Sequence, residues 1–444
     1  MFVLMLIIFV IGYMAIAFEH TIHIDKAAAA LLTGVLVWTA MVFGKETIFA
    51  GTEAVGEHGV EGLSHFIEHH LMEHLSEIGS ILFFLLGAMT IVELIDAHQG
   101  FTIITDKIKT TNRVKLIWIL AIITFFFSAV LDNLTTSIVM AALLKKLVAD
   151  KHDLWFIGGL IVIAANAGGA WSPIGDVTTI MLWIGGQITA AKIIAGIFIP
   201  SLVAILVPLL IVSVTNKGNV TSPTEREHVF KHAPVPERDK KIVFFMGIGA
   251  LLFVPIFKTF THLPPFMGIL LGLGALWVTT EILHRNKNDE HFSHLTVVGT
   301  LREVDVPSVL FFLGILLAVA GLQTAGHLDI LSHGLDKAFS GNIYIINILI
   351  GLLSSIVDNV PLVAGAMGMY SMDVFPPDHA FWEFLAYCAG TGGSVLIIGS
   401  AAGVAIMGIL KIDFMWYLKK ISFLALAGYL AGAGTYYLME HFIL

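Results

Sequence analysis

Long apolar segments separated by short polar ones run along almost the whole chain. Many contain about 20 apolar residues, the length that a helix needs to cross the roughly 30 Å hydrocarbon core of a bilayer. A membrane β-barrel would instead show short segments of alternating polarity. The first segment, residues 1–18, lacks a basic start and a small-residue cleavage site, so we expect a retained helix and not a signal peptide. The pattern predicts an all-α polytopic membrane protein with about ten crossing helices.

Two apolar segments have lengths that do not fit a simple crossing. Residues 115–147 would form a helix of roughly 50 Å, which is too long for one crossing and too short for two with a turn. Lys115 and Lys145 place both of its ends on the same, cytoplasmic side. We therefore predict a re-entrant hairpin of two half-helices. Residues 343–372 have the same shape without basic flanks, and they are predicted to form a second hairpin that enters from outside.

Each predicted hairpin carries an Asp-Asn pair at its centre. The first pair is Asp132 and Asn133 in V-L-D-N-L-T-T, and the second is Asp358 and Asn359 in I-V-D-N-V-P-L, 226 positions later. A carboxylate near the bilayer midplane is so unfavourable that an ion or proton site is its default explanation. Because the site occurs twice, the sequence predicts an inverted-repeat transporter.

A glycine-rich stretch follows each hairpin. A-N-A-G-G-A-W-S-P-I-G-D lies in the apolar segment 154–184, and A-G-T-G-G-S-V-L-I-I-G-S lies in 381–410. The glycines, together with Pro173, favour an unwound break in each segment. A break frees carbonyl oxygens and aims the dipoles of two half-helices at one point. We therefore predict two broken helices, each facing a hairpin tip.

The repeat also predicts how the chain is divided into parts. A polar stretch, residues 215–241, separates the two halves. The predicted parts are N-terminal helices with a His-rich interfacial segment (1–77), a first repeat core (78–214), a cytoplasmic linker (215–241), second-half scaffold helices (242–306) and a second repeat core (307–444).

The polar residues of the tips and breaks form a candidate cation and proton site. Carboxylate, amide, hydroxyl and carbonyl oxygens suit a small hard cation such as Na⁺ or Li⁺. The candidate ligands are Asp132, Asn133, Thr135, Thr136, Asn166, Ser172 and Asp176 in the first half, and Asp358, Asn359, Thr391, Ser394 and Ser400 in the second. Na⁺ itself is assigned to the three acids among them.

The two halves differ at one acidic position, because Asp176 corresponds to Ser400 in the repeat. Burial and a neighbouring carboxylate both favour the protonated form of a carboxyl group. We therefore expect Asp132 and Asp176 to hold a proton when no cation is bound, and an entering cation to expel it.

Simpler roles remain open for these residues. Asp132 and Asp358 are also placed to cap the second half-helices, and Pro361 suits the first turn of such a helix. Capping and cation binding are compatible. For Asp176 the alternative is a hydrogen bond at the helix break, and for the serines and Thr391 it is satisfaction of freed backbone groups.

Segment 53–77 is rich in histidine and glutamate. The spacing of its apolar residues predicts an amphipathic interfacial helix. Its functional interpretations are a pH sensor or adventitious metal binding, and the alternative is an ordinary solvated helix face. The histidines are His58, His65, His69, His70 and His74.

Composition narrows the class of protein. With 57% hydrophobic and 13% charged residues and a mean hydropathy of +0.89, the chain is not a soluble globular protein. The net charge of −9 is spread over loops without a basic patch, which argues against nucleic-acid binding. One cysteine, Cys388, excludes an internal disulfide, and no zinc pattern of Cys and His is present, so no cofactor is predicted.

The four motifs quoted above closely resemble those of the NhaD-type sodium/proton antiporters, in the same order, from about residue 78 to residue 440. That family belongs to the ion transporter superfamily, with arsenite permeases and dicarboxylate transporters. The resemblance implies Na⁺(Li⁺)/H⁺ exchange in a bacterial inner membrane, an elevator-like movement of a transport subdomain against a scaffold, and a homodimer. The family's ligands carry over onto Asp132, Asn133, Asp176, Asp358 and Asn359.

Two other functions compete with this one. Dicarboxylate relatives tend to carry serine at the positions of Asp132 and Asp358, and three buried acids make an anionic cargo electrostatically unfavourable. Neutral arsenite is harder to set aside. An intramembrane aspartyl protease would have no use for the paired asparagines. The sequence therefore predicts a secondary transporter in the lipid bilayer and not an enzyme.

Overall fold

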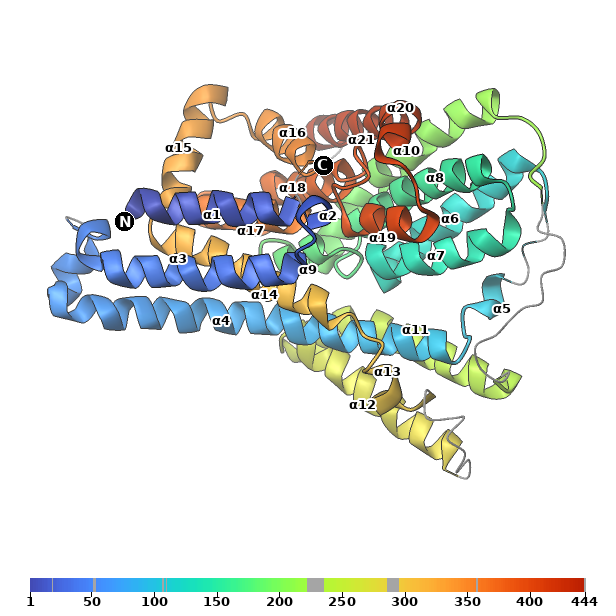
Figure 1. The fold of residues 1–444 in the computed structure, drawn as a ribbon, viewed down its shortest axis with the longest axis horizontal. Helices are drawn as coiled ribbons and strands as arrows, with labels where there is room; N and C mark the ends of the chain where they lie inside the picture. Colours follow the sequence, from blue (N-terminus) through green and yellow to red (C-terminus); the bar gives the residue numbers. More distant parts are fainter. Residues whose placement is uncertain are drawn as a thin grey trace. The chain divides into compact units, whose positions relative to one another are not determined.

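The computed structural model describes residues 1–442 apart from residues 18, 51–52, 106–107, 109, 222–234, 286–294 and 357. Every regular element in these ranges is a helix, which confirms the all-α class (Figure 1). The centre of the predicted linker and the side chain of His58 lie outside the described parts. The chain divides into two compact units. Unit 1 contains Met1–Leu85, Asp305–Ile346 and Val360–Pro376, and unit 2 contains Leu86–Val304, Asn347–Asn359 and Pro377–Leu444.

Unit 1 is built on two helices that pack closely. These are α3 (Lys26–Ile48) and α14 (Val306–Thr324), and α1 (Phe2–Ala17) lies beside α3 (Figure 1). A methyl group on Gly34 would lie 2.7 Å from the carbonyl oxygen of Gly314, so the absence of side chains lets the two backbones approach. Trp38 then donates from Nε1 to the carbonyl oxygen of Leu317 at 2.8 Å.

The His-rich segment belongs to one long helix, α4 (Glu53–Ala97), with 45 residues. Leu63 and Ile67 are buried in a core cluster with Trp38, Met41 and Val319. These two residues of the apolar stripe are therefore covered by protein. Because α4 contains no proline, the His-rich segment continues into the apolar residues that follow it, and its place at the membrane interface stays a prediction.

Unit 2 contains both predicted helix breaks and the first predicted hairpin. The hairpin is α6 and α7, which pack against each other and meet at Asp132. The breaks separate α8 from α9 and α18 from α19, as the glycine-rich stretches predict. The bounds are α6 (Arg113–Leu131), α7 (Asn133–Leu147), α8 (Lys151–Ala170), α9 (Val177–Ile184), α10 (Ala190–Thr215), α18 (Ala380–Gly392), α19 (Ala401–Leu410), α20 (Phe414–Lys420) and α21 (Ser422–Phe442).

The remaining helices complete both units. The second predicted hairpin is interrupted after α16 (Ile343–Leu353) and resumes as α17 (Asn359–Met369). The others are α2 (Glu19–Ile22), α5 (Thr102–Thr105), α11 (Glu237–Thr261), α12 (Pro265–His284), α13 (Val297–Thr300) and α15 (His327–Phe339).

Eight helices of the described ranges are long and apolar enough to cross a membrane, or nine if the pair α19–α20, bent by 116°, counts as one. The halves α18 and α19 have 13 and 10 residues, so neither alone reaches the length of a crossing. The chain is a multi-pass membrane protein. The prediction of about ten crossings counted each broken helix as one crossing. The count of eight or nine includes only long helices and the pair α19–α20, so the two numbers are not directly comparable.

The contacts follow the sequence repeat. Ser128 donates from Oγ to the carbonyl oxygen of Ala165 at 2.5 Å, and the equivalent Ser354 donates to the carbonyl oxygen of Ala389 at 3.0 Å. In each half, a serine just before the hairpin tip thus forms a hydrogen bond with the backbone of the helix that precedes the break.

Two glycines at equivalent positions of the repeat let the broken helix lie close to the backbone of the hairpin helix. A methyl group on Gly168 would collide with the carbonyl oxygen of Phe125, and one on Gly392 would collide with that of Gly351. Since the contact recurs in both repeats, the close packing of hairpin against broken helix belongs to the architecture.

Candidate functional site

The first hairpin tip is Asp132, which stands between α6 and α7. Its backbone has φ 80° and ψ 163°, a region that glycine normally occupies and that costs a non-glycine residue about 1–3 kcal/mol. Its Oδ1 accepts a hydrogen bond from the Thr135 backbone N–H at 2.7 Å, and its Oδ2 accepts one from the Thr135 hydroxyl at 2.9 Å. The predicted capping role of Asp132 is confirmed. Glycine would fit this backbone but could not accept either hydrogen bond, and the cap remains compatible with cation binding by the same carboxylate.

The break between α8 and α9 ends at Asp176, which is buried and caps α9. Its Oδ1 accepts hydrogen bonds from the backbone N–H and the hydroxyl of Thr178, at 2.9 and 2.8 Å. Its Oδ2 accepts a hydrogen bond from Asn133 Nδ2 at 2.5 Å. The first hairpin tip and the first broken helix therefore meet through this carboxylate.

The second hairpin tip reaches the same carboxylate. Asn359 Nδ2 lies 3.4 Å from Oδ1 and 3.5 Å from Oδ2 of Asp176. Asp132 and Asp358 are both close enough to Asp176 for their charges to interact with it. The structure thus gathers the three acids and both tip asparagines, which the sequence places far apart.

Asn166 of α8 connects this cluster to the second broken helix. It accepts a hydrogen bond from Asn133 at 3.1 Å and donates to the hydroxyls of Ser394 and Ser400 at 2.9 and 2.8 Å. Ser400 also accepts a hydrogen bond from the Gly403 backbone N–H at 3.2 Å and so caps α19. Ser400 and Asp176 are therefore equivalent caps, as their positions in the repeat predict.

The remaining candidate hydroxyls bond backbone carbonyl groups or have no partner among the described residues. Ser172 donates to the carbonyl oxygen of Ala129 at 2.5 Å, and Thr391 donates to that of Tyr387 at 2.5 Å. Both satisfy backbone groups, which was the simpler interpretation. The buried Thr136 hydroxyl has no hydrogen-bond partner within the described parts of the chain.

Two polar residues of unit 2 escaped the sequence analysis. Thr178 supplies two of the hydrogen bonds to Asp176, and its position two residues after a capping aspartate is the signal that identifies it. Glu383 of α18 is a further buried acid, which lies 3.7 Å from Lys192 Nζ and accepts a hydrogen bond from the Tyr436 hydroxyl at 3.3 Å. Nothing in the sequence pattern indicates that pairing.

The arrangement defines a class of protein. Paired helix breaks and hairpin tips that meet at buried polar groups, within a chain of apolar helices, are typical of secondary transporters. Comparison with known proteins identifies the family. The citrate transporter family matches residues 4–383.

Curated relatives narrow the identification. The chain is 46% identical over 434 residues to sodium/proton antiporter 1 of Arabidopsis thaliana, covering 98% of this chain and 72% of that one. It is 44% identical to sodium/proton antiporter 2 of the same plant, over 99% and 100% of the two chains. It is 31% identical to the Na⁺/H⁺ antiporter NhaD of Vibrio cholerae, over 98% and 91%. The chain belongs to the citrate transporter family and, within it, to the NhaD-type sodium/proton antiporters.

Proposed function

We propose that this protein is a Na⁺(Li⁺)/H⁺ antiporter that exports Na⁺ in exchange for protons. The observation that carries the proposal is the convergence of Asn133 and Asn359 on the Asp176 carboxylate. Amide N–H groups that point at one carboxylate hold its oxygens in place. Each amide also carries a carbonyl oxygen, a suitable ligand for a hard cation.

The proposed exchange depends on competition between a cation and protons for the same buried carboxylates. Asp132, Asp176 and Asp358 interact electrostatically, so three negative charges together are unfavourable unless a cation or protons compensate them. Na⁺ bound among the three acids would displace the protons, and release of Na⁺ on the other side would allow reprotonation.

The hydroxyls around the acids complete the proposed ligand set. Thr136 fits best, because its buried oxygen is without a hydrogen-bond partner in the described residues and a bound cation would satisfy it. Thr135 holds the Asp132 carboxylate. We assign Ser394 and Ser400 to the same site through Asn166, which binds both. Ser172 bonds a carbonyl oxygen of α6 and Thr391 one of its own helix, so we propose supporting roles for these two and not cation ligation.

An organic-anion permease is the second candidate, since the family that matches is described as citrate transporter. Against it stands the chemistry of the cluster. Asp176 and its neighbours present three carboxylates, and the groups that donate hydrogen bonds to Asp176 are two amides, a hydroxyl and a backbone N–H. A polycarboxylate cargo would meet like charge there. This argument does not apply to arsenite, which is a neutral species. The vesicle assay distinguishes arsenite transport from Na⁺/H⁺ exchange.

We further propose that the protein works as a homodimer in a bacterial inner membrane, with an elevator-like movement between a transport and a scaffold part. The predicted division of the chain into N-terminal, repeat-core, linker and scaffold parts belongs to the same proposal. The similarity to NhaD of Vibrio cholerae supports the bacterial location, whereas the Arabidopsis relatives leave a plant membrane as the alternative. Light scattering of the detergent-solubilised protein, corrected for bound detergent, measures the number of subunits.

The test of the activity is proton movement in inside-out vesicles from a host without its own antiporters. Respiration acidifies the vesicles, and Na⁺, Li⁺, K⁺, citrate or arsenite is then added. We expect alkalinisation with Na⁺ or Li⁺ that Asp132→Asn and Asp358→Asn abolish. Movement driven by citrate or arsenite, with no response to Na⁺ or Li⁺, would replace the antiporter by a permease.

A further inference from the structure

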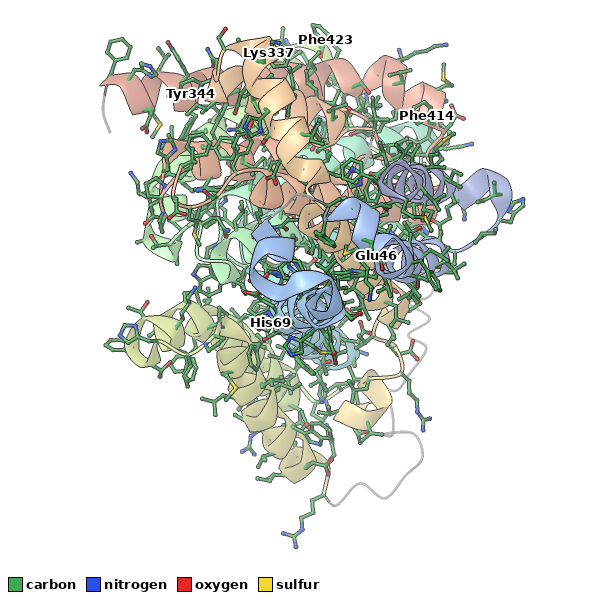
Figure 2. The ribbon with its side chains drawn as sticks, turned by 90° about the vertical axis from the view of Figure 1, so that its left-hand side faces the viewer. Glu46, His69, Lys337, Tyr344, Phe414 and Phe423 are labelled. Carbon is green, nitrogen blue, oxygen red and sulfur yellow. The ribbon has the colours of Figure 1, made fainter. Side chains whose placement is uncertain are left out.

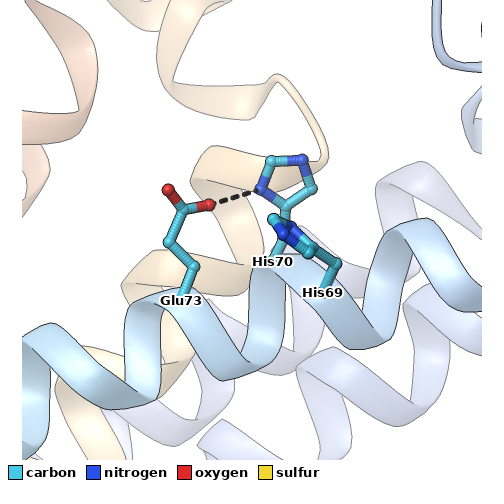
Figure 3. Close-up of side chains that lie close together, drawn as sticks. All are labelled: His69, His70 and Glu73. Carbon is cyan, nitrogen blue, oxygen red and sulfur yellow. Dashed lines mark ion pairs between the residues drawn. The ribbon is translucent and has the colours of Figure 1, made fainter.

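A second group of polar side chains lies on α4, within unit 1 and apart from the buried acids. His69, His70 and Glu73 each offer one ligand atom, and these atoms all lie within 4.8 Å of one another (Figure 3). His69 and Glu73 are exposed and His70 is half-buried, with His69 labelled on α4 in Figure 2. We propose that these three residues bind a divalent transition-metal ion of the zinc class.

The spacing fits such an ion. His70 Nδ1 and Glu73 Oε2 are 3.3 Å apart. Two ligands that lie about 2.0–2.1 Å from a tetrahedral zinc ion are separated by roughly 3.4 Å, so this pair needs little movement to share one ion. His69 precedes Glu73 by four residues, which places both on the same side of the helix.

Packing holds one of the two imidazoles in place. The His70 ring meets the Phe66 ring edge-to-face at 4.4 Å between centroids, and Phe66 packs in the same way on Phe49 at 5.4 Å. Phe66 in turn packs against the core cluster of unit 1. A ring held by a core residue loses little conformational freedom when it binds a metal, which favours affinity.

The donor set selects the kind of ion. Two imidazole nitrogens and one carboxylate suit zinc and its neighbours in the periodic table, whereas Mg²⁺ and Ca²⁺ prefer oxygen ligands alone. Three protein ligands leave a fourth position for water, because two of the three side chains are exposed.

The next histidine along α4 has different partners. His74 lies 3.3 Å from the Thr324 hydroxyl through Nε2 and 3.8 Å from Glu77 Oε2 through Nδ1. It contacts the edge of Trp38. His74 thus faces the protein, and the proposed site is confined to the turn before it.

The test is calorimetric titration of the full chain in detergent with ZnCl₂, after any affinity tag has been removed and bound metal has been stripped with a chelator. We expect one saturable site per chain, with no comparable signal from MgCl₂. His69→Ala, His70→Ala and Glu73→Gln should each weaken zinc binding by about tenfold or more, since the first two remove a ligand nitrogen and the third removes the charge of the carboxylate ligand.

His333→Ala is the matched control. His333 is an exposed histidine of the same unit, and its Nδ1 contacts the Asp329 carbonyl oxygen one turn earlier in α15. Its replacement should leave zinc binding unchanged. His69 is exposed, so its replacement does not disturb the core, and thermal unfolding without metal verifies that each variant is folded. Unaltered zinc affinity in folded His69→Ala, or an equal loss in His333→Ala, would overturn the proposal.

Discussion

Asp176 has two separable roles, as a helix cap and as a charge, and the repeat shows how to separate them. Its counterpart Ser400 caps α19 without a charge. Asp176→Ser should therefore keep α9 capped, through the backbone N–H three residues on, as in the bond from Gly403 to Ser400, while it removes the carboxylate. We expect Na⁺-dependent proton movement to fall to the background, whereas the protein remains folded.

The magnitude follows from the bonds that change. The substitution loses the 2.5 Å hydrogen bond from Asn133, and a bond to a charged group contributes about 1.5–3 kcal/mol. It also relieves the burial of a carboxylate, which costs several kcal/mol in proteins. These terms oppose each other, so the free energy of unfolding should change by no more than about 2 kcal/mol.

Asp176→Asn should be the less stable variant. Its amide has one acceptor, and if this accepts the hydrogen bonds of Thr178, the NH₂ group faces the NH₂ group of Asn133. Both variants lose the bond from Asn133, but Asp176→Asn adds a buried NH₂ donor of its own that has no acceptor, which costs about 1–3 kcal/mol relative to Asp176→Ser.

The assay combines thermal unfolding in detergent with proton movement in vesicles. Asp150→Ser is the matched control, because Asp150 caps α8 through a 2.9 Å hydrogen bond from the Asp153 N–H and is exposed. It should transport like the wild type. Near-normal transport by Asp176→Ser would refute the role of the carboxylate, and equal stability of the serine and asparagine variants would refute the hydrogen-bond argument.

Two further predictions concern packing and pH. Gly168→Ala should destabilise the protein by about 1–3 kcal/mol, because its methyl group would collide with the Phe125 carbonyl oxygen. Gly408→Ala, with nothing within 4 Å, should not, and thermal unfolding compares the two. Burial lowers the pKa of His327 from 6.5, although a hydrogen bond to the Phe2 backbone opposes this. As pH falls, His327 therefore takes up a proton in the unfolded chain before it does so in the folded protein, and the free energy of unfolding should decrease below about pH 6.5. The same decrease in His327→Gln would contradict this role of His327.

The sequence by itself determined the kind of helices and where they break. Each of these features is local. Apolar length predicts crossings, and glycine and proline predict breaks, while a carboxylate before Asn133 predicts a cap. The helices accordingly begin at Asn133 and Val177, directly after Asp132 and Asp176. The 226-residue offset of the tips likewise predicted equivalent contacts, because repeated sequences fold in the same way.

Tertiary structure decided which of the predicted groups meet. Asn359 reaches Asp176 from 183 residues away, and Thr391 bonds its own helix. The pattern of apolar and polar residues does not distinguish these two cases. It predicts that a side chain is buried, but it does not predict which residues cover it. For the same reason the sequence does not show that protein covers Leu63 and Ile67 of α4, or that Glu383 lies beside Lys192. Partners that come from distant segments are fixed only when the whole chain packs.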